Sequence, residues 1–483
     1  MSTAQLELTH ITQAAARASA IAAATPDARR AEWLLAVADI LDANSAELVA
    51  LADEETHLGE ARLAGEVART SGQLRLFARV ITEGSYLEAI IDHANPAAVP
   101  PTPDLRRVLR PLGPVAVFSA SNFPFAFSVA GGDTASALAV GCAVVVKAHS
   151  GHPRLSERTA ELVAEALRGA GAPEGLFSLV SGRDAGTALV QDPAIKAVGF
   201  TGSIPGGRAL FDLAVSRPDP IPFYGELGSL NPVVLTQAAI EARGAELASG
   251  LAGSFTLGAG QFCTKPGLVF LPEGTDFAAL LAAASREKPA GAMLTDRIAE
   301  AYPEGLRGHA TVPGVDVVVG SVDQRALAEG AAPVVFRTSA ATVFEHPDRL
   351  LEECFGPTTV LIEYQDREEL HRVLALVPGS LTATVDAEPG EDIQAVAEQL
   401  AGLAGRVLFG GWPTGVAVNW AQHHGGPWPA TTSLFTSVGA TAARRFQRPV
   451  AYQDAPEALL PEALREENPL RIPRRVDGVL SLP

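Results

Sequence analysis

Residues 113–150 read GPVAVFSASNFPFAFSVAGGDTASALAVGCAVVVKAHS, and this stretch decides the fold. A β-branched run that ends in small residues, within 108–120, predicts a buried strand. Residues 132–141 (GDTASALAVG) predict a helix, and residues 142–150 (CAVVVKAHS) predict a second buried strand. Strand, helix and strand therefore follow one another within 50 residues, roughly the length of one α/β repeat.

The same alternation continues on both sides of this stretch. Residues 8–90 carry apolar residues at three- and four-residue spacing, which predicts several amphipathic helices. After residue 150, expected helices cover 153–171, 184–192 and 206–215, and expected strands cover 177–182, 194–203 and 221–228. Such regular alternation is typical of a doubly wound parallel sheet.

The pattern restarts after Asn231, which predicts a second α/β domain. Expected strands cover 231–237, 267–272, 341–345, 358–364 and 380–386, with helical regions over 240–260 and 393–405. We therefore expect one α/β domain from residues 1–90 and 109–230 and another from 231–443. Residues 91–108 and 444–483 show no obvious core of their own, so we expect them to pack on the body or on a neighbouring subunit.

Composition indicates a reduced, cytoplasmic, water-soluble enzyme. Hydrophobic residues make up 47% and charged residues 19% of the 483 residues, which is ordinary for a globular enzyme. The net charge of −18 repels nucleic acid and anionic membranes. The three cysteines have no CxxC spacing, so neither a disulfide framework nor a structural zinc site is indicated. No signal peptide is visible, and no apolar run is long enough to span a bilayer.

Two short segments carry candidate chemistry. Residues 254–266 (SFTLGAGQFCTKP) place Cys263 in a Gly- and Gln-containing loop between apolar runs, and residues 224–232 (YGELGSLNP) place Glu226 between glycines. A thiol and a carboxylate in such segments suggest a nucleophile and a base that serve one covalent mechanism. The alternative is a small buried cysteine and an ion-paired glutamate.

Four further segments join these two: SNFP (121–124), VKAHS (146–150), FTGS (200–203) and EECFGP (352–357). The first three end successive predicted strands, and ligands bind at the carboxyl ends of strands in a doubly wound sheet. The chain contains no strict GxGxxG after a strand, no P-loop, no HExxH and no GxSxG, which argues against P-loop kinases, zincins and α/β-hydrolases.

In their order and approximate spacing, these six segments resemble the aldehyde dehydrogenase superfamily from about residue 10 to the end of the chain. Within it the chain is most similar to the NADP-preferring α-ketoglutaric semialdehyde (2,5-dioxopentanoate) dehydrogenases, through residues 113–138, 260–270 and 424–439. The resemblance implies that the first α/β domain binds the cofactor and the second carries the nucleophile. It also implies a homodimer or homotetramer, with 91–108 and 444–483 as oligomerisation arm and tail.

The resemblance implies catalytic roles for three residues. Cys263 attacks the aldehyde, and the Asn122 amide and the Cys263 backbone N–H hold the oxyanion. Glu226 activates the water that hydrolyses the thioester, and can also deprotonate Cys263. The implied cofactor residues are Lys147, His149, Ser150, Gly202, Ser203, Glu353 and Phe355, and the implied pocket residues are Ser121, Phe127 and Phe262.

The cofactor expected from the resemblance is NADP, with NAD also accepted. NAD-preferring members often carry Glu three residues after the lysine, where this chain has Ser150. A 2′-phosphate would be met by Lys147 and Ser150, with His149 or Arg154 as a second cation, and no carboxylate lies nearby in sequence. No metal is expected. His423-His424 is expected to form a loop or pocket wall, because no carboxylate lies at ligand spacing.

The function implied is oxidation of an anionic ω-oxo acid, α-ketoglutaric semialdehyde, to the carboxylate. Within the same chemistry, a succinic-semialdehyde or broad aliphatic-aldehyde dehydrogenase is the alternative. A CoA-dependent acyl-transferring enzyme is a different class, and Glu226 counts against it because a water-activating base has little use there. A catalytically silent homologue would lack Cys263, Glu226 or Asn122, and all three are present.

Overall fold

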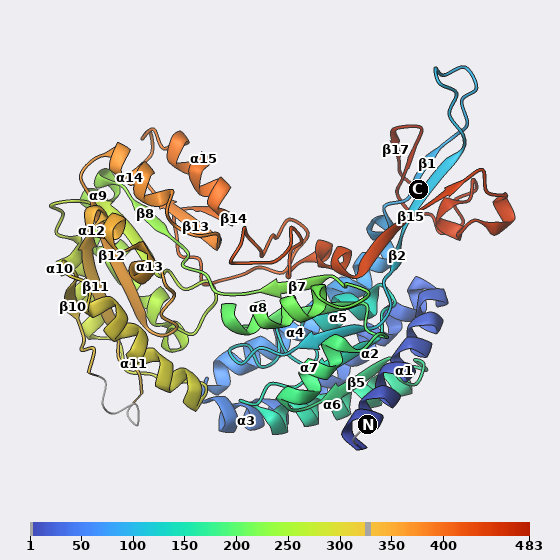
Figure 1. The fold of residues 1–483 in the computed structure, drawn as a ribbon, viewed down its shortest axis with the longest axis horizontal. Helices are drawn as coiled ribbons and strands as arrows, with labels where there is room; N and C mark the ends of the chain where they lie inside the picture. Colours follow the sequence, from blue (N-terminus) through green and yellow to red (C-terminus); the bar gives the residue numbers. More distant parts are fainter. Residues whose placement is uncertain (1–2, 324–329) are drawn as a thin grey trace.

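The computed structural model describes residues 3–323 and 330–483, and three β-sheets organise the chain (Figure 1). The first sheet has the order β5-β4-β3-β6-β7, and every neighbouring pair is parallel. Its strands are β3 (Val115–Phe118), β4 (Val144–Lys147), β5 (Phe177–Val180), β6 (Ala197–Thr201) and β7 (Phe223–Glu226). The doubly wound parallel sheet predicted from the alternating pattern is confirmed.

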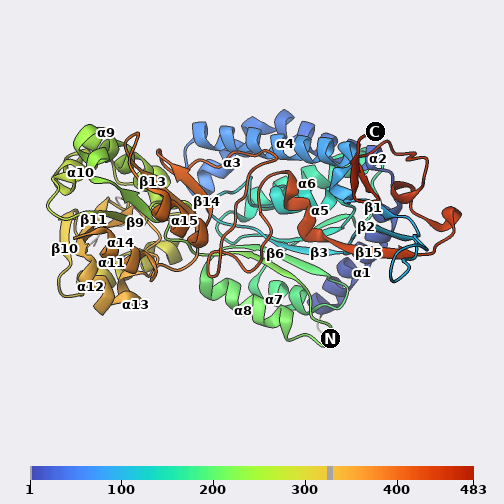
Figure 2. The same cartoon turned by 90° about the horizontal axis from the view of Figure 1, so that it is seen from above.

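Helices cover both faces of this sheet, as Figure 2 shows with α4 on one side and α7 and α8 on the other. Because both faces are buried, the strands are continuous apolar runs rather than alternating ones. Val144 to Val146, for example, are all 0% exposed. The helices are α1 (Thr3–Ala24), α2 (Asp27–Ala43), α3 (Ser45–Thr56), α4 (Glu60–Glu83), α5 (Gly132–Ala139), α6 (Pro153–Gly169), α7 (Arg183–Gln191) and α8 (Ile204–Val215).

The second sheet has the order β10-β11-β12-β9-β8-β13-β14, and only the β10–β11 pair is antiparallel. Its strands are β8 (Val233–Leu235), β9 (Leu268–Pro272), β10 (Asp316–Val319), β11 (Val334–Ser339), β12 (Thr358–Tyr364), β13 (Ser380–Asp386) and β14 (Ala404–Phe409). Its helices are α9 (Gln237–Thr256), α10 (Phe277–Arg286), α11 (Asp296–Ala310), α12 (Ala340–Glu345), α13 (Pro347–Leu350), α14 (Arg367–Leu374) and α15 (Gln394–Leu403).

The strand predicted over 341–345 is wrong, because these residues form helix α12. Their β-branched and aromatic residues favour a strand locally, but β11 ends immediately before them at Ser339. The Ser339 side chain accepts a hydrogen bond from the backbone N–H of Thr342, which caps a helix at this point. Strands β10, β11 and β14 were not predicted.

The third sheet joins the two segments that lack an obvious core in the sequence. Its order is β15-β2-β1-β16-β17, with β1 (Ile90–Asp92), β2 (Leu105–Pro111), β15 (Gln447–Gln453), β16 (Arg474–Val476) and β17 (Val479–Ser481). The single strand predicted within 108–120 is therefore two strands, β2 and β3, in different sheets. Buried residues from both segments, including Ile91, Val108 and Leu464, form a small apolar cluster beneath it.

The topology sets three strand ends side by side. Strands β4, β3 and β6 are consecutive neighbours in the first sheet, so the segments that follow them lie at one edge. These are the segments that begin at Ser121, Ala148 and Gly202.

Among the described residues, no helix combines the length and apolar character that crossing a membrane requires.

Candidate active site

The loop that carries Cys263 depends on a left-handed backbone. It follows the short 3₁₀ segment η2 (Leu257–Gly260), in which Gly258, Ala259 and Gly260 all have positive φ angles near 60°. At Gly260 an added Cβ would lie 2.2 Å from the Gly356 carbonyl oxygen, so only glycine fits there. The glycines before Cys263 therefore let this loop pack directly against the EECFGP segment.

Asn231 fixes the position of the Cys263 backbone. Its side-chain amide donates to the carbonyl oxygens of Cys263 (2.8 Å) and Lys265 (2.9 Å). Its Oδ1 accepts from the Ser229 hydroxyl and from the backbone N–H and hydroxyl of Thr382. The sequence pattern alone predicts no role for Asn231. Its side chain is 1% exposed and satisfied in every direction, so it orients the loop rather than meeting a ligand.

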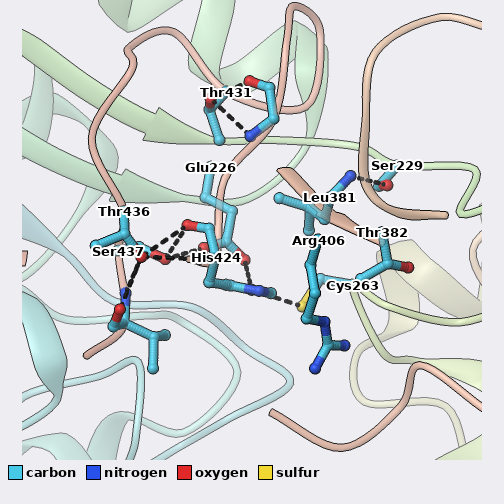
Figure 3. A network of polar contacts seen from close by, with 12 residues as sticks. Glu226, Ser229, Cys263, Leu381, Thr382, Arg406, His424, Thr431, Thr436 and Ser437 are labelled. Atoms are coloured by element: carbon cyan, nitrogen blue, oxygen red, sulfur yellow. Dashed lines mark hydrogen bonds and ion pairs between the residues drawn. The ribbon is translucent and has the colours of Figure 1, made fainter. Parts of the chain in front are cut away.

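Glu226 and His424 meet at the Cys263 thiol (Figure 3). The Nε2 atom of His424 lies 2.9 Å from Glu226 Oε1 and 3.6 Å from Cys263 Sγ. The Ser437 hydroxyl donates to the other carboxylate oxygen of Glu226 at 2.6 Å. Glu226 is 3% and His424 1% exposed, so these contacts form away from bulk water.

His424 lies in contact with the candidate catalytic pair, although the sequence predicted only a loop or pocket wall at this position. No carboxylate lies at ligand spacing from it in the sequence, but folding brings Glu226, 198 residues earlier in the chain, against it. Its Nδ1 is buried without a hydrogen-bond partner, so Nε2 makes all the side-chain hydrogen bonds of this ring. The only signal in the sequence was its position in the 424–439 segment, which carries the closer resemblance.

The surroundings of Cys263 and Glu226 shift the pKa values of these two groups in opposite directions. Burial raises the pKa of the Cys263 thiol well above its usual range, and the charge of Glu226 raises it further, while Arg69 lowers it. Burial also acts to raise the pKa of Glu226, but contacts with His424, Ser437 and Cys263 outweigh it and lower that pKa. The carboxylate is therefore ionised beside a protonated thiol, which is the arrangement of a base and a latent nucleophile.

Asn122 lies beside the Cys263 loop, since its amide donates to the Gln261 carbonyl oxygen at 3.0 Å. The Arg62 guanidinium donates to the Asn122 backbone carbonyl at 2.6 Å and holds this loop from the other side. Around them, Phe123 packs edge-on against Phe262, with ring centroids 5.2 Å apart. The remaining predicted pocket residues, Ser121 and Phe127, are half-buried, and the Phe127 ring centroid lies 6.1 Å from that of His424.

Lys147, His149 and Ser150 follow β4 as predicted, but the charges around them differ from the expectation. Burial lowers the pKa of His149 to about 3, helped by the nearby His152 and Lys147, so His149 is neutral at neutral pH. Arg154 is engaged with Glu54 (2.9 Å) and Glu55 (3.4 Å). No carboxylate lies nearby in sequence, but α3 brings Glu54 and Glu55 to this edge, where they pair with the Arg154 proposed as a second cation.

The other predicted cofactor residues flank the same region. Gly202 and Ser203 are exposed at the start of α8, and the Ser203 hydroxyl caps the helix by accepting from the Gly206 N–H at 3.4 Å. Glu353 lies against Gly228, where an added Cβ would come within 2.6 Å of Glu353 Oε2. Burial raises the pKa of Glu353 to about 7, although Lys265 acts to lower it. Phe355, two residues further along the chain, is half-buried.

The remaining cysteines pack in the interior as expected. Cys142 is 0% exposed just before β4, and Cys354 is 6% exposed in the apolar core of the second domain. Glu226, Cys263 and His424 each place one atom of a metal-ligating type within 4.8 Å of the others. The hydrogen bonds among these three groups account for their closeness.

Comparison with known proteins agrees with this fold. The family model described as the aldehyde dehydrogenase family matches residues 2–427. A curated relative from Azospirillum brasilense, alpha-ketoglutaric semialdehyde dehydrogenase 2, is 50% identical over 94% of this chain and 88% of its own length. The alpha-ketoglutaric semialdehyde dehydrogenase of Acinetobacter baylyi is 42% identical over 95% of this chain and 88% of its own length.

The fold is also that of 1-pyrroline-5-carboxylate dehydrogenase from Thermus, solved with bound NAD. That structure superposes with a TM-score of 0.79 at 21% identity, over 93% of this chain and 86% of its own. The chain belongs to the aldehyde dehydrogenase family, whose members oxidise aldehydes to carboxylates with NAD(P). Among the curated relatives, it is similar to the alpha-ketoglutaric semialdehyde dehydrogenases over most of its length.

Proposed function

We propose that this chain oxidises α-ketoglutaric semialdehyde to its dicarboxylate, with NADP as the preferred cofactor, through a covalent intermediate on Cys263. The observation that carries the mechanism is the contact of Glu226 and His424 with the Cys263 thiol. The similarity to two alpha-ketoglutaric semialdehyde dehydrogenases supports the substrate.

In the first half of the reaction Glu226 takes the Cys263 proton, and the thiolate sulfur forms a bond to the aldehyde carbon. His424 Nε2–H, within reach of both groups, can move its hydrogen bond from the carboxylate to the sulfur as charge shifts to it. The aldehyde oxygen becomes an oxyanion, and the Asn122 amide and the Cys263 backbone N–H stabilise it. Such fixed donors in a water-poor site commonly provide a large share of the catalysis.

In the second half the Cys263 thioester is hydrolysed. A nicotinamide cofactor held here would supply the hydride acceptor, and loss of the hydride would bring the Cys263 adduct to the acyl level. Glu226 releases the first proton to solvent and then takes a proton from a water molecule that attacks the acyl carbon, the carbon–sulfur bond breaks, and this second proton returns to Cys263. Ser437 holds the carboxylate in place through both halves with its 2.6 Å hydrogen bond.

The residues present fit a nicotinamide dinucleotide. The exposed start of α8 at Gly202 and Ser203 offers N–H groups and a partial positive charge to a pyrophosphate. Lys147 at the end of β4 is the cation for the adenosine ribose or its phosphate. Glu353 is the carboxylate for the nicotinamide ribose hydroxyls, with Phe355 beside the nicotinamide. We assign cofactor binding to residues 1–90 and 109–230 and the nucleophile to 231–443.

Cofactor choice provides a sharp test at Ser150. We expect wild-type kcat/KM to favour NADP over NAD by about tenfold, since one charge-assisted hydrogen bond contributes about 1.5–3 kcal/mol. The preference rests on Lys147 and Ser150, because His149 is neutral and Arg154 is paired. Ser150→Glu should reverse it by repelling the 2′-phosphate and accepting from the 2′-hydroxyl. The measurement is kcat/KM for both cofactors.

The matched control for Ser150→Glu is Glu165→Gln, an exposed charge change on the outer part of α6. It should leave the cofactor ratio unchanged. Equal kcat/KM for NADP and NAD in the wild type, with Ser150→Glu leaving the ratio as it was, would show that the phosphate lies free in solvent.

The substrate is tested with a panel of aldehydes assayed by reduced-cofactor formation. α-Ketoglutaric semialdehyde should give the highest kcat/KM, above succinic semialdehyde and uncharged aliphatic aldehydes. A higher value for either of the latter would replace the proposed substrate with that class. Added CoA should neither accelerate turnover nor appear in a thioester product, because Glu226 directs the acyl group to water.

We also propose a homodimer or a dimer of dimers. Strand β17 forms one edge of the third sheet, and Val479, Leu480 and Leu482 in and after it are 69%, 59% and 71% exposed. An edge strand with exposed apolar side chains favours pairing with another chain. Sedimentation at micromolar concentration should give at least twice the mass of one chain, and a single-chain species would contradict this. Leu480→Glu should weaken the association.

A further inference from the structure

Three charged side chains lie along one face of α4, near the active site but outside the proposed chemistry. Arg62, Glu66 and Arg69 are four and three residues apart, so they point to the same side of the helix. The Arg62 guanidinium carbon lies 4.7 Å from the Phe262 ring centroid. That of Arg69 lies 5.5 Å from the Phe127 centroid and 5.8 Å from the Phe123 centroid.

The hydrogen bonds of this group leave two Arg69 donors unused, together with Arg62 Nη1 and Glu66 Oε2. Arg62 donates to the Asn122 carbonyl, and Glu66 Oε1 accepts from the backbone N–H groups of Phe125 (2.8 Å) and Ala126 (2.9 Å). Arg69 Nε and Nη2 are buried and have no hydrogen-bond partner, and no ion pair among the described residues involves Arg69. Buried polar groups are nearly always paired, so two orphan donors on one guanidinium indicate a missing acceptor.

The charges are also unbalanced in favour of an anion. Two guanidinium groups, of Arg62 and Arg69, face a single carboxylate, Glu66. Burial raises the pKa of Glu66, so this carboxyl group is less readily ionised and balances less of their positive charge. A buried cation without a counter-ion is unfavourable, and binding of an anion removes the imbalance.

The orphan donors are close to the reacting thiol. The Phe127 ring that contacts Arg69 also contacts His424, whose Nε2 lies 3.6 Å from Cys263 Sγ. The charges of Cys263 and Glu226 also act on Arg69, where they oppose the lowering of its pKa by burial. Arg406 is another guanidinium beside the thiol, but its two terminal nitrogens already donate to the Gly415 and Pro413 carbonyls, so only its Nε lacks a partner.

We propose that Arg69 is the binding site for the distal carboxylate of the substrate, and that it thereby selects short ω-oxo acids over uncharged aldehydes. The inference rests on the proposed function and identifies the residue that recognises the substrate's acid end. Arg69 Nε and Nη2 lie on one edge of the guanidinium, which matches the two oxygens of a carboxylate. The Phe123 and Phe127 rings shield this ion pair from water and fill the space beside the aliphatic carbons.

The test compares an acidic and an uncharged five-carbon aldehyde, α-ketoglutaric semialdehyde and pentanal, in Arg69→Gln. Loss of charge-assisted hydrogen bonds should reduce kcat/KM for the semialdehyde by about 10- to 100-fold, mainly through KM. Pentanal should change by less than about threefold. Arg69→Lys, which keeps the charge but loses the paired donors, should give an intermediate value. Arg79→Gln, an exposed change on the same helix, should behave as the wild type.

Inhibition of pentanal oxidation by glutarate, a dicarboxylate of matching length, provides a second readout that does not depend on the proposed substrate. The inhibition constant should rise about tenfold or more in Arg69→Gln. Equal losses with both aldehydes would assign Arg69 a purely structural role and overturn the inference. A wild type that prefers the semialdehyde, with this preference unchanged in Arg69→Gln, would overturn the inference and leave the proposed function intact. A wild type without that preference would overturn the proposed function.

Discussion

Cys263→Ala should abolish dehydrogenase activity while cofactor binding survives. The substitution removes the sulfur that forms the covalent bond, and no other described cysteine can replace it, because Cys142 and Cys354 are packed in the interior. Loss of a covalent nucleophile reduces kcat by about three powers of ten or more. The cofactor should bind as before, because the segments at the ends of β4 and β6 do not depend on the thiol.

The measurements are steady-state kcat and a titration of cofactor binding by fluorescence. The loop around residue 263 should remain in place in the variant, because Asn231 holds it through backbone oxygens and not through the sulfur. A variant that keeps more than about 1% of wild-type kcat while remaining folded would rule out covalent catalysis by Cys263.

Glu226→Gln should uncouple the two halves of the reaction. Glutamine can still accept the Ser437 hydrogen bond, but it cannot take a proton from water, so thioester hydrolysis should slow by about 10²-fold or more. Formation of the thioester should slow less, because His424 Nε2–H remains 3.6 Å from the sulfur and can stabilise the thiolate by donating a hydrogen bond to it. Rapid mixing should show a burst of reduced cofactor, close to one per active site, followed by a slow steady state.

Mass spectrometry of the stalled Glu226→Gln enzyme should detect the acyl group on Cys263. His424→Gln is the informative companion, since it keeps the water-activating carboxylate but removes the ring that contacts the thiol. It should slow the burst itself. If both phases slow equally in Glu226→Gln and no acyl-enzyme accumulates, Glu226 is mainly the base for the thiol.

Much of the fold was determined by local sequence. The apolar runs at Val115–Phe118 and Val144–Lys147 form buried strands because only a sheet covered on both faces accommodates them. Their alternation with helices predicted that the strands are parallel. It therefore also predicted that Asn122, Lys147 and Ser203, which follow three of the strands, lie at the same edge of the sheet. Residues 341–345 show the limit of local prediction. Their side chains favour a strand, but β11 ends just before them and the Ser339 cap starts a helix there.

By itself, the sequence identified the thiol, the carboxylate and the strand ends, because each lies in a short segment with its own pattern. Only the tertiary structure brought His424 to Glu226, Glu54 and Glu55 to Arg154, and Arg69 to the rings beside the thiol. These contacts join residues between 54 and 198 positions apart, and they follow no regular spacing in the chain. Charge balance and hydrogen-bond pairing depend on which groups lie close together in three dimensions. The neutral form of His149 and the unpartnered donors of Arg69 could therefore be recognised only in the folded chain.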